Sequence, residues 1–142
     1  MLYENTNKKF VTVFNKKIPF SVLANASTHI MAGLIAAHPD INEMEFLNYS
    51  NKDSLKSTIS RHPSIILTAK NSNQLRVLRE YADEIKIPNN SFVRTMLGNS
   101  SEDQLQQTLD SDDANMEYIA ISLFGNSEEL NPITKKFSLF KG

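Results

Sequence analysis

Hydrophobic residues follow the two-residue period of strands in some segments and the 3.6-residue period of helices in others. The pattern predicts strands over residues 9–14, 44–49, 64–69, 92–97, 118–124 and 136–140. Between them it predicts helices over residues 19–37, 53–61, 71–85, 100–109 and 128–133. The continuous apolar run of 64–69 is typical of a central strand covered on both faces. Strands that alternate with helices indicate an α/β sheet with helices on its faces.

Turn residues and charged loops separate these elements. We expect turns at residues 15–18 and 88–90, an acidic loop over 110–117, and a strand end at Gly125-Asn126. At 142 residues the chain is one domain, residues 1–142, and we expect residues 1–7 to form a flexible N-terminal extension.

The predicted helix 19–37 is apolar or small nearly all round, apart from one polar stripe. Ser21, Asn25 and His29 recur at i, i+4 and i+8 and therefore share a face, with Thr28 beside them. A helix that is apolar all round is expected to be buried. A buried amide and imidazole need partners, so the stripe either satisfies neighbouring backbone or lines a cleft.

Composition narrows the function classes. The chain has no cysteine, which excludes disulfides, thiolate metal sites and cysteine nucleophiles. The net charge is −1, with +3 on residues 1–71 and −4 on residues 72–142, which is too mild for a DNA-binding surface. Residues 1–9 do not form a secretory signal, and the polar centre of helix 19–37 argues against a membrane span. We therefore expect a cytoplasmic protein with no DNA or membrane partner.

Several segments resemble a small bacterial family catalogued as domain of unknown function 2000. The resemblance rests on Lys9–Phe14, on the segment Leu23-Ala-Asn-Ala-Ser-Thr-His-Ile-Met-Ala-Gly33, and on the ending Ser122–Gly125 through Thr134–Leu139. That family is similar in fold to the archaeal and eukaryotic type of peptidyl-tRNA hydrolase (type II). The resemblance implies a single three-layer domain with a mixed β-sheet and helices on both faces.

The hydrolase motif Lys-Ile-Ala-Ala-Gln-Cys-Ser-His-Ala, aligned through its histidine, falls on Val22–Ile30. Its lysine then falls on Val22 and its glutamine on Ala26, so only His29 carries over. The hydrolase segment Asp-Ala-Gly-Arg-Thr has no counterpart, although Arg94 and Thr95 lie in the corresponding region. The fold analogy therefore does not establish peptidyl-tRNA hydrolysis.

Three groups of residues are candidates for binding. Asn25 and His29 could anchor a ligand, with His29 as a general acid or base, or could form a buried structural pair. Lys16 and Lys17 precede the first helix, where free backbone N–H groups favour a phosphate or carboxylate; the alternative is a solvated lysine pair. Arg94 and Thr95 form the third group, because they lie where the hydrolase family keeps part of its site. The alternative for Arg94 is an ion pair with a surface acid.

No metal or cofactor is assigned. Asp110, Asp112, Asp113, Asn115 and Glu117 lack the glycine and glutamate spacing of a calcium loop. His29, His38 and His62 show no metal-ligand spacing, and the last two precede prolines as turn residues do. No Gly-rich phosphate loop or nucleophile elbow is present.

The sequence supports one leading hypothesis and two alternatives. The leading one is a small-molecule or phosphate-bearing ligand bound in a cleft at the N-terminal half of the first helix, contacted by Ser21, Asn25, Thr28, His29, Lys16, Lys17, Arg94 and Thr95. The first alternative is a hydrolase of an ester or tRNA-linked substrate that uses His29. The second is a homo-oligomeric interaction module, such as a homodimer, without a ligand.

Overall fold

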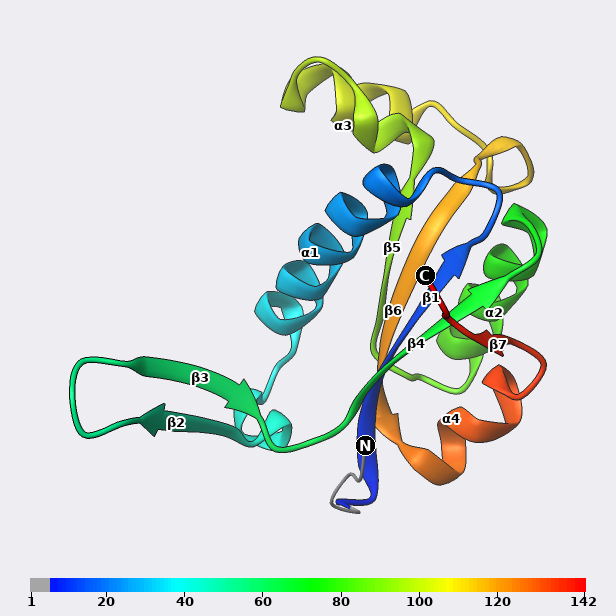
Figure 1. Ribbon diagram of the computed structural model, residues 1–142. Coiled ribbons are helices and arrows are strands. Elements are labelled where there is room, and N and C mark those ends of the chain that lie inside the picture. Colours follow the sequence, from blue (N-terminus) through cyan, green and yellow to red (C-terminus); the bar gives the residue numbers. More distant parts are fainter. Residues whose placement is uncertain (1–5) are drawn as a thin grey trace.

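The computed structural model describes residues 6–142 and contains a five-stranded mixed sheet in the order β5-β6-β1-β4-β7 (Figure 1). The strands of this sheet are β1 (Lys8–Asn15), β4 (Ser64–Ala69), β5 (Asn89–Val93), β6 (Tyr118–Asn126) and β7 (Ser138–Leu139). The helices are α1 (Phe20–Ala37), α2 (Ser72–Glu84), α3 (Ser101–Leu109) and α4 (Ser127–Thr134). Strand β1 runs parallel to β4 and antiparallel to β6, which makes the sheet mixed.

Helices cover both faces of the sheet, as the sequence predicts. Helix α1 packs on one face, where Leu23, Ala26 and Ile30 meet Phe14 and Phe92. Helices α2 and α4 pack on the other face, around Leu75, Leu78 and Leu130. Helix α3 lies beyond the end of β5 and none of its residues is buried. The prediction of an α/β domain with a mixed sheet between helices is therefore confirmed.

The strand covered on both faces is β6, not β4. Every residue from Tyr118 to Phe124 is buried, because β6 lies between β5 and β1 with helices on both sides. Strand β4 keeps alternate positions exposed, and Ile66 is 39% exposed. An apolar run alone did not distinguish the central strand from its neighbour.

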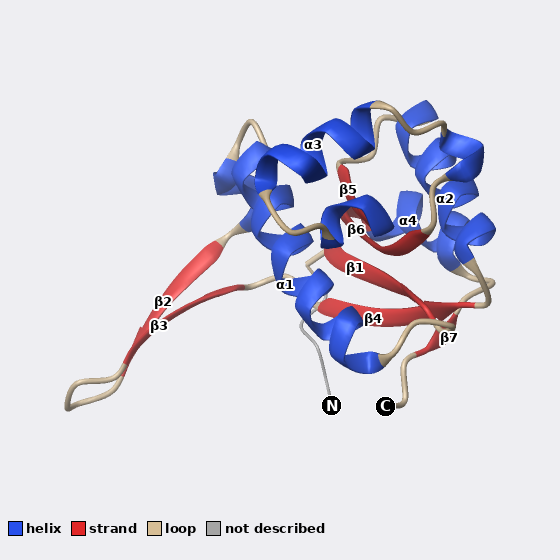
Figure 2. Ribbon diagram, turned by 90° about the horizontal axis from the view of Figure 1, so that it is seen from above, coloured by secondary structure: helices blue, strands red, loops and turns tan. Residues whose placement is uncertain are grey.

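A second, two-stranded sheet consists of β2 (Phe46–Ser50) and β3 (Lys56–Ser60), an antiparallel hairpin that projects from the main sheet (Figure 2). The 3₁₀ helix η1 (Ile41–Met44) precedes it. The predicted helix over residues 53–61 is wrong. The β-branched Thr58 and Ile59 pair with Asn48 and Leu47 instead, and this cross-strand pairing overrides the local helical pattern.

Helix α1 is confirmed in position but is not buried all round. Only Leu23, Ala26, Ile30 and Leu34 are buried among its eighteen residues. The opposite face consists of small and weakly polar residues, whose exposure to water costs little. By length and composition α1 is long and apolar enough to span a membrane, a test that core helices of soluble proteins also pass.

The remaining differences lie at element ends. Asn89 and Asn90 belong to β5 and not to a turn. After a β-bulge at Phe92/Val93 the predicted strand 92–97 becomes the 3₁₀ helix η2 (Arg94–Leu97). Gly125 and Asn126 continue β6, the last strand spans only Ser138–Leu139, and the acidic loop contains η3 (Asp113–Asn115).

The sequence predicts a flexible extension over residues 1–7. Residues 1–5 of it lie outside the described residues, and Thr6 and Asn7 lie within them. Thr6 hydrogen-bonds His62, and the carbonyl of Asn7 accepts from the backbone N–H of Ser127 at 2.9 Å. Both residues are thus tied to the domain.

Candidate functional site

A groove of about 490 Å³ runs between α1 and the segment that forms β5, η2 and the start of α3. Its apolar lining includes Ile30, Phe92, Met96 and Leu97, and its polar lining includes Asn25, His29, Asn90 and Gln104, with Ser91 and Gly98 completing the wall. This volume lies within the roughly 300–1,000 Å³ range of small-molecule sites. The lining combines an apolar floor with a few polar groups, which is the usual make-up of such sites.

Asn25 and His29 lie one turn apart on α1, and both face this groove. Both side chains are exposed, and neither has a hydrogen bond or ion pair to another described residue. The ring of His29 lies 6.2 Å from the ring of Phe92, centroid to centroid. Of the two roles open for the stripe, Asn25 and His29 line a cleft, and their side chains do not satisfy neighbouring backbone.

The far wall of the groove is held in place by three contacts. Gln104 donates from Nε2 to the carbonyl of Gly98 at 2.9 Å, which ties α3 to the turn before it. The Thr95 and Thr108 hydroxyls hydrogen-bond at 2.6 Å and tie η2 to α3. Arg94 donates from Nε to Glu117 at 2.7 Å in an exposed ion pair. Arg94 and Thr95 therefore position the wall rather than contact the groove.

The backbone of β5 also borders the groove, at Asn90, Ser91 and Phe92. Strand β5 ends the sheet, so its outer edge has no neighbouring strand. Asn90 and Phe92 point toward α1, whereas the Ser91 side chain points toward the opposite face. The Ser91 hydroxyl is buried there without a hydrogen bond, so it is not a ligand-facing group of this groove.

The other predicted residues lie elsewhere. Ser21 is exposed outside the groove, and the Thr28 hydroxyl donates to the carbonyl of Asn25 at 2.8 Å. Lys17 is exposed, and its backbone N–H donates to Asn15 Oδ1 at 3.0 Å. Lys16 borders a separate hollow of about 430 Å³ beside Phe20 and the C-terminal residues. The structure thus does not unite the lysine pair with Asn25 and His29 in one cleft.

A further hollow of about 400 Å³ lies between the end of α1 and the start of β5, and it contains His38. The His38 side chain is 5% exposed, and its Nε2 lies 3.6 Å from Glu43 Oε2, beyond hydrogen-bond distance. Neither ring nitrogen has a hydrogen bond in the described chain, and both are covered by protein atoms. A ligand in this hollow therefore meets no accessible imidazole nitrogen, unlike a ligand beside His29.

Among the described residues, the ionisable groups with shifted pKa values are Lys9 and Arg79, and both lie outside the groove. Burial alone would lower the pKa of Arg79, but the Tyr118 phenol, Asp113 and Asp83 outweigh it and raise that pKa. Burial lowers the pKa of Lys9. In residues 6–142 no three His, Asp or Glu side chains are clustered closely enough to hold a metal ion.

The residue pattern along the chain did not indicate the far wall of the groove. Phe92, Met96, Leu97, Gly98 and Gln104 fall in a segment expected to be a strand followed by a helix. A signal was present in Gly98 and in Ser100, whose hydroxyl caps α3 by accepting from the Asp103 N–H at 3.2 Å. Together they indicate that the chain turns sharply before α3, which builds a wall opposite α1.

Comparison with known proteins supports the family and the fold. A search of curated proteins finds no match. The solved structure of the protein of unknown function Atu0240 from Agrobacterium tumefaciens str. C58 is similar, with a TM-score of 0.81 at 14% sequence identity. The match covers 95% of this chain and 98% of that chain, and at this identity it shows the fold alone. The family model for proteins of unknown function DUF2000 matches residues 8–141, so the chain belongs to the DUF2000 family.

Proposed function

We propose that the protein binds a small, neutral, partly apolar molecule in the groove between α1 and the β5–η2–α3 segment. The observation that carries this proposal is the pair of free polar side chains, Asn25 and His29, beside the apolar floor of Phe92 and Met96. An amide and an imidazole offer both donors and acceptors to one ligand edge. The apolar floor contributes affinity through burial of the remaining ligand surface.

The geometry favours a neutral ligand over a phosphate. No lysine or arginine lines the groove among the described residues. Lys16 borders a separate hollow, Lys17 is not among the residues that line the groove, and Arg94 is paired with Glu117. A dianionic group in the groove would lose its hydration without gaining a cationic partner, which is costly.

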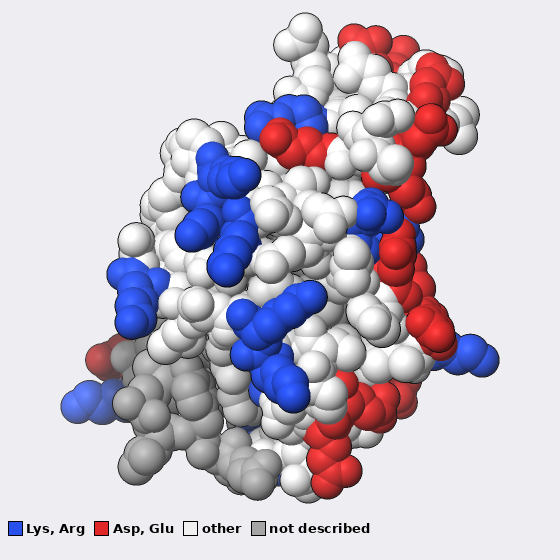
Figure 3. Space-filling view, turned by 90° about the vertical axis from the view of Figure 1, so that its right-hand side faces the viewer, with Lys and Arg blue, Asp and Glu red and all other residues white. Residues whose placement is uncertain are grey.

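Charge on one side of the molecule shows no sign of a nucleic-acid interface. On the side that carries α2 and β7, lysine and arginine side chains form small separate groups, and acidic side chains form a band beside them (Figure 3). A nucleic-acid interface shows a continuous basic surface instead. The proposal includes the cytoplasmic location expected from the sequence.

Hydrolysis by a peptidyl-tRNA hydrolase II-like site is the alternative that the sequence resemblance raised. His29, the one motif residue carried over, does lie in the groove. It has no carboxylate partner among the described residues to orient its ring, which general acid–base catalysis by histidine usually requires. Binding is therefore favoured over catalysis, and the fold similarity to that hydrolase type stays a proposal.

Native mass spectrometry tests binding on protein purified gently from cells. We expect a small added mass on the wild-type protein that denaturation removes. The added mass should be absent from the Asn25→Ala/His29→Ala variant and present on Thr28→Ala, the matched control on the same helix. Added mass equal to inorganic phosphate, or an adduct retained by the double variant, would argue against a neutral ligand in this groove.

A further inference from the structure

The outer edge of β5 carries backbone groups that do not pair with the rest of the sheet. Strand β5 is the outermost strand and lies beside α1 (Figure 1). In an antiparallel pair, every second residue exchanges its backbone hydrogen bonds with the partner strand, and the residues between them turn their N–H and C=O groups the other way. The Phe124 N–H donates to the Pro88 carbonyl at 3.1 Å, so the backbone of Pro88 faces β6. The register therefore turns the backbone groups of Asn89 and Ser91 outward.

Ser91 borders the groove with its backbone. Its hydroxyl is covered by protein atoms on the opposite face of the sheet, and yet the residue lines the groove. No other described residue donates to the outward carbonyl of Ser91 or accepts from its N–H. Edge strands often protect such groups with charged side chains, but β5 has no charged residue. The groove thus contains one free donor and one free acceptor, side by side on a strand.

The direction of these two groups selects the shape of the ligand. Both backbone groups of an outward residue point the same way, so they fit a partner whose own donor and acceptor also lie side by side. An open-chain amide is trans, and its N–H and C=O groups point in opposite directions. A cyclic amide, or lactam, is held cis by its ring. Its N–H can therefore donate to the Ser91 carbonyl while its C=O accepts from the Ser91 N–H.

We propose that the ligand of this groove is a planar lactam-type heterocycle that pairs its N–H and C=O groups with the backbone of Ser91. This inference rests on the proposed function, because it names the chemical class of the small neutral ligand. The apolar part of the ring packs on Phe92 and Met96, and Asn25 and His29 bind its remaining polar groups. Two backbone hydrogen bonds fix the orientation of the ring, and the apolar floor supplies most of the affinity.

The edge of β5 suits one ring better than a peptide strand. A peptide that extends a sheet gains its affinity from main-chain hydrogen bonds along the edge. Strand β5 begins at Asn89, and the bulge at Phe92/Val93 ends the regular ladder, so its outward residues are Asn89 and Ser91. Of these two residues, Ser91 alone lines the groove. The groove therefore offers one pair of hydrogen bonds, which is enough for a ring and short for a strand.

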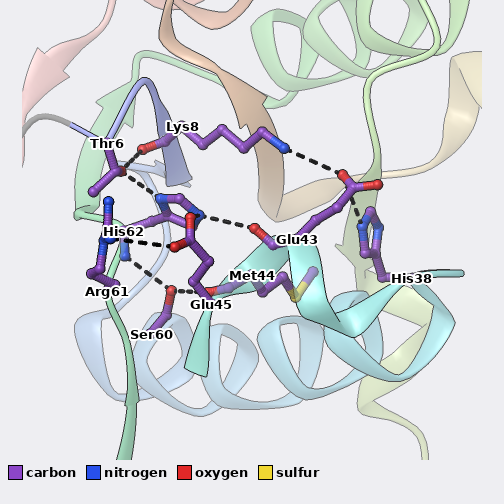
Figure 4. A network of polar contacts seen from close by, with 9 residues as sticks. All are labelled: Thr6, Lys8, His38, Glu43, Met44, Glu45, Ser60, Arg61 and His62. Atoms are coloured by element: carbon purple, nitrogen blue, oxygen red, sulfur yellow. Dashed lines mark hydrogen bonds and ion pairs between the residues drawn. The ribbon is translucent and has the colours of Figure 1, made fainter. Parts of the chain in front are cut away.

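The outward groups of Asn89 lie in a less suitable environment. Asn89 borders the hollow that contains His38 and Lys86. Figure 4 shows His38 turned toward Glu43, whose carboxylate also lies 3.5 Å from Lys8. Lys86 and the Lys8–Glu43 pair place charge at this end of the hollow, and a neutral ring would have to desolvate these charged groups at a cost. The pairing therefore belongs to the groove and not to this hollow.

Two matched compounds test the pairing on the isotope-labelled full chain by two-dimensional amide NMR. The first is 2-quinolinone, a neutral planar lactam fused to an apolar ring. The second is 1-methyl-2-quinolinone, which lacks the N–H and places a methyl group against the Ser91 carbonyl. We expect 2-quinolinone to bind with a downfield shift of the Ser91 amide proton, because this N–H gains an acceptor. We expect the methylated compound to bind at least about tenfold more weakly.

A backbone variant gives an independent test. Ser91→Pro removes the outward N–H and leaves every hydrogen bond to β6 in place, since proline is tolerated on an edge strand where its nitrogen faces away from the sheet. This variant should bind 2-quinolinone at least about tenfold more weakly than the wild-type protein. Ser91→Ala is the matched control, because it keeps the N–H and removes only the hydroxyl, and it should bind like the wild-type protein. Circular dichroism checks the folding of both variants, and the two compounds test the pairing without any substitution.

The outcomes separate this inference from the proposed function. Equal binding of the two compounds, or groove binding by neutral fragments but not by 2-quinolinone, would overturn the lactam pairing and leave the groove as a binding site. A capped, uncharged pentapeptide that binds in the groove more than about tenfold tighter than 2-quinolinone would overturn it in favour of a peptide strand. If no neutral compound binds in a way that His29→Ala abolishes, the proposed function fails and this inference fails with it.

Discussion

Gly33 of α1 lies directly against the side chain of Asn90 of β5. A Cβ atom at Gly33 would be 2.6 Å from Asn90 Nδ2, closer than two such atoms can approach. The same Nδ2 donates to the Ile30 carbonyl at 3.0 Å. This contact joins helix to strand between the groove that holds His29 and the hollow that holds His38, because Asn90 borders both.

A double-mutant cycle at Gly33 and Asn90 should show this coupling. Alanine in a helix interior is about 0.5–1 kcal/mol more favourable than glycine. In the wild-type protein, Gly33→Ala displaces Asn90 from its hydrogen bond, worth about 0.5–1.5 kcal/mol, so gain and loss nearly cancel. In an Asn90→Ala protein the same substitution should raise the free energy of unfolding by about 0.5–1 kcal/mol. Urea denaturation measures both values, and equal effects in the two backgrounds would refute the coupling.

Replacing Asn25 or His29, the two polar side chains that α1 contributes to the groove, should leave the free energy of unfolding nearly unchanged. Asn25 and His29 are exposed and have no side-chain hydrogen bond or ion pair within the described chain. We therefore expect Asn25→Ala and His29→Ala each to change the free energy of unfolding by less than about 0.5 kcal/mol. Urea denaturation gives the value, with Thr28→Ala as the control. A loss of several kcal/mol would mean that the two residues are structural.

Arg79 should contribute far more to stability than Arg76 on the same helix. Arg79 donates from Nε to the phenol oxygen of the buried Tyr118 at 2.8 Å and pairs with Asp83 and Asp113 at 2.9 Å each. Arg79→Met leaves the phenol oxygen without this donor, at a cost of about 1–3 kcal/mol.

Arg76→Met is the matched control, since it removes an exposed i, i+4 pair with Glu80, worth about 0.3–0.5 kcal/mol. Equal losses in chemical denaturation of the two variants would show that the Tyr118 contact is not important.

Lys9 should make stability depend on alkaline pH. Burial lowers its pKa below the ordinary 10.5 in the folded protein, so folding disfavours its charged form. This penalty is complete at neutral pH, where the lysine is charged in both states. It disappears as the pH rises through the lowered folded-state pKa toward 10.5.

The wild-type protein should therefore gain stability relative to Lys9→Met between about pH 7 and about pH 10.5. Paired urea titrations at these pH values measure the difference. A difference that stays constant, or that moves against the wild-type protein, would rule out this effect of burial.

Much of the fold could be predicted because most elements carry a strong local pattern. The order of strands and helices and the cap of α3 at Ser100 follow from periodicity and turn residues. Strand β2 overlaps the strand predicted over residues 44–49, but β3 could not be predicted, because Thr58 and Ile59 become a strand only through pairing with β2. His62 precedes a proline like a turn residue, yet its buried position depends on Thr6 and Glu43, which lie far from it in sequence.

One wall of the candidate site, on α1, could be predicted from the sequence, and the opposite wall could not. The spacing of Asn25 and His29 places both on one face of α1, and that holds in the structure. Their exposure was not foreseen, because the apolar composition of α1 resembles that of a buried helix. The opposite wall depends on the bulge at Phe92/Val93, which turns the chain into η2, and no residue pattern in β5 specifies it.

A titration of the isotope-labelled protein with a library of small neutral fragments, followed by two-dimensional amide NMR, tests the binding groove most directly. We expect fragments with an amide or hydroxyl beside a ring to shift the signals of Ile30, Phe92 and Gly98, and His29→Ala to abolish these shifts. Thr28→Ala should retain them. Fragments that shift only signals outside the groove, or that bind His29→Ala equally well, would contradict the proposed function.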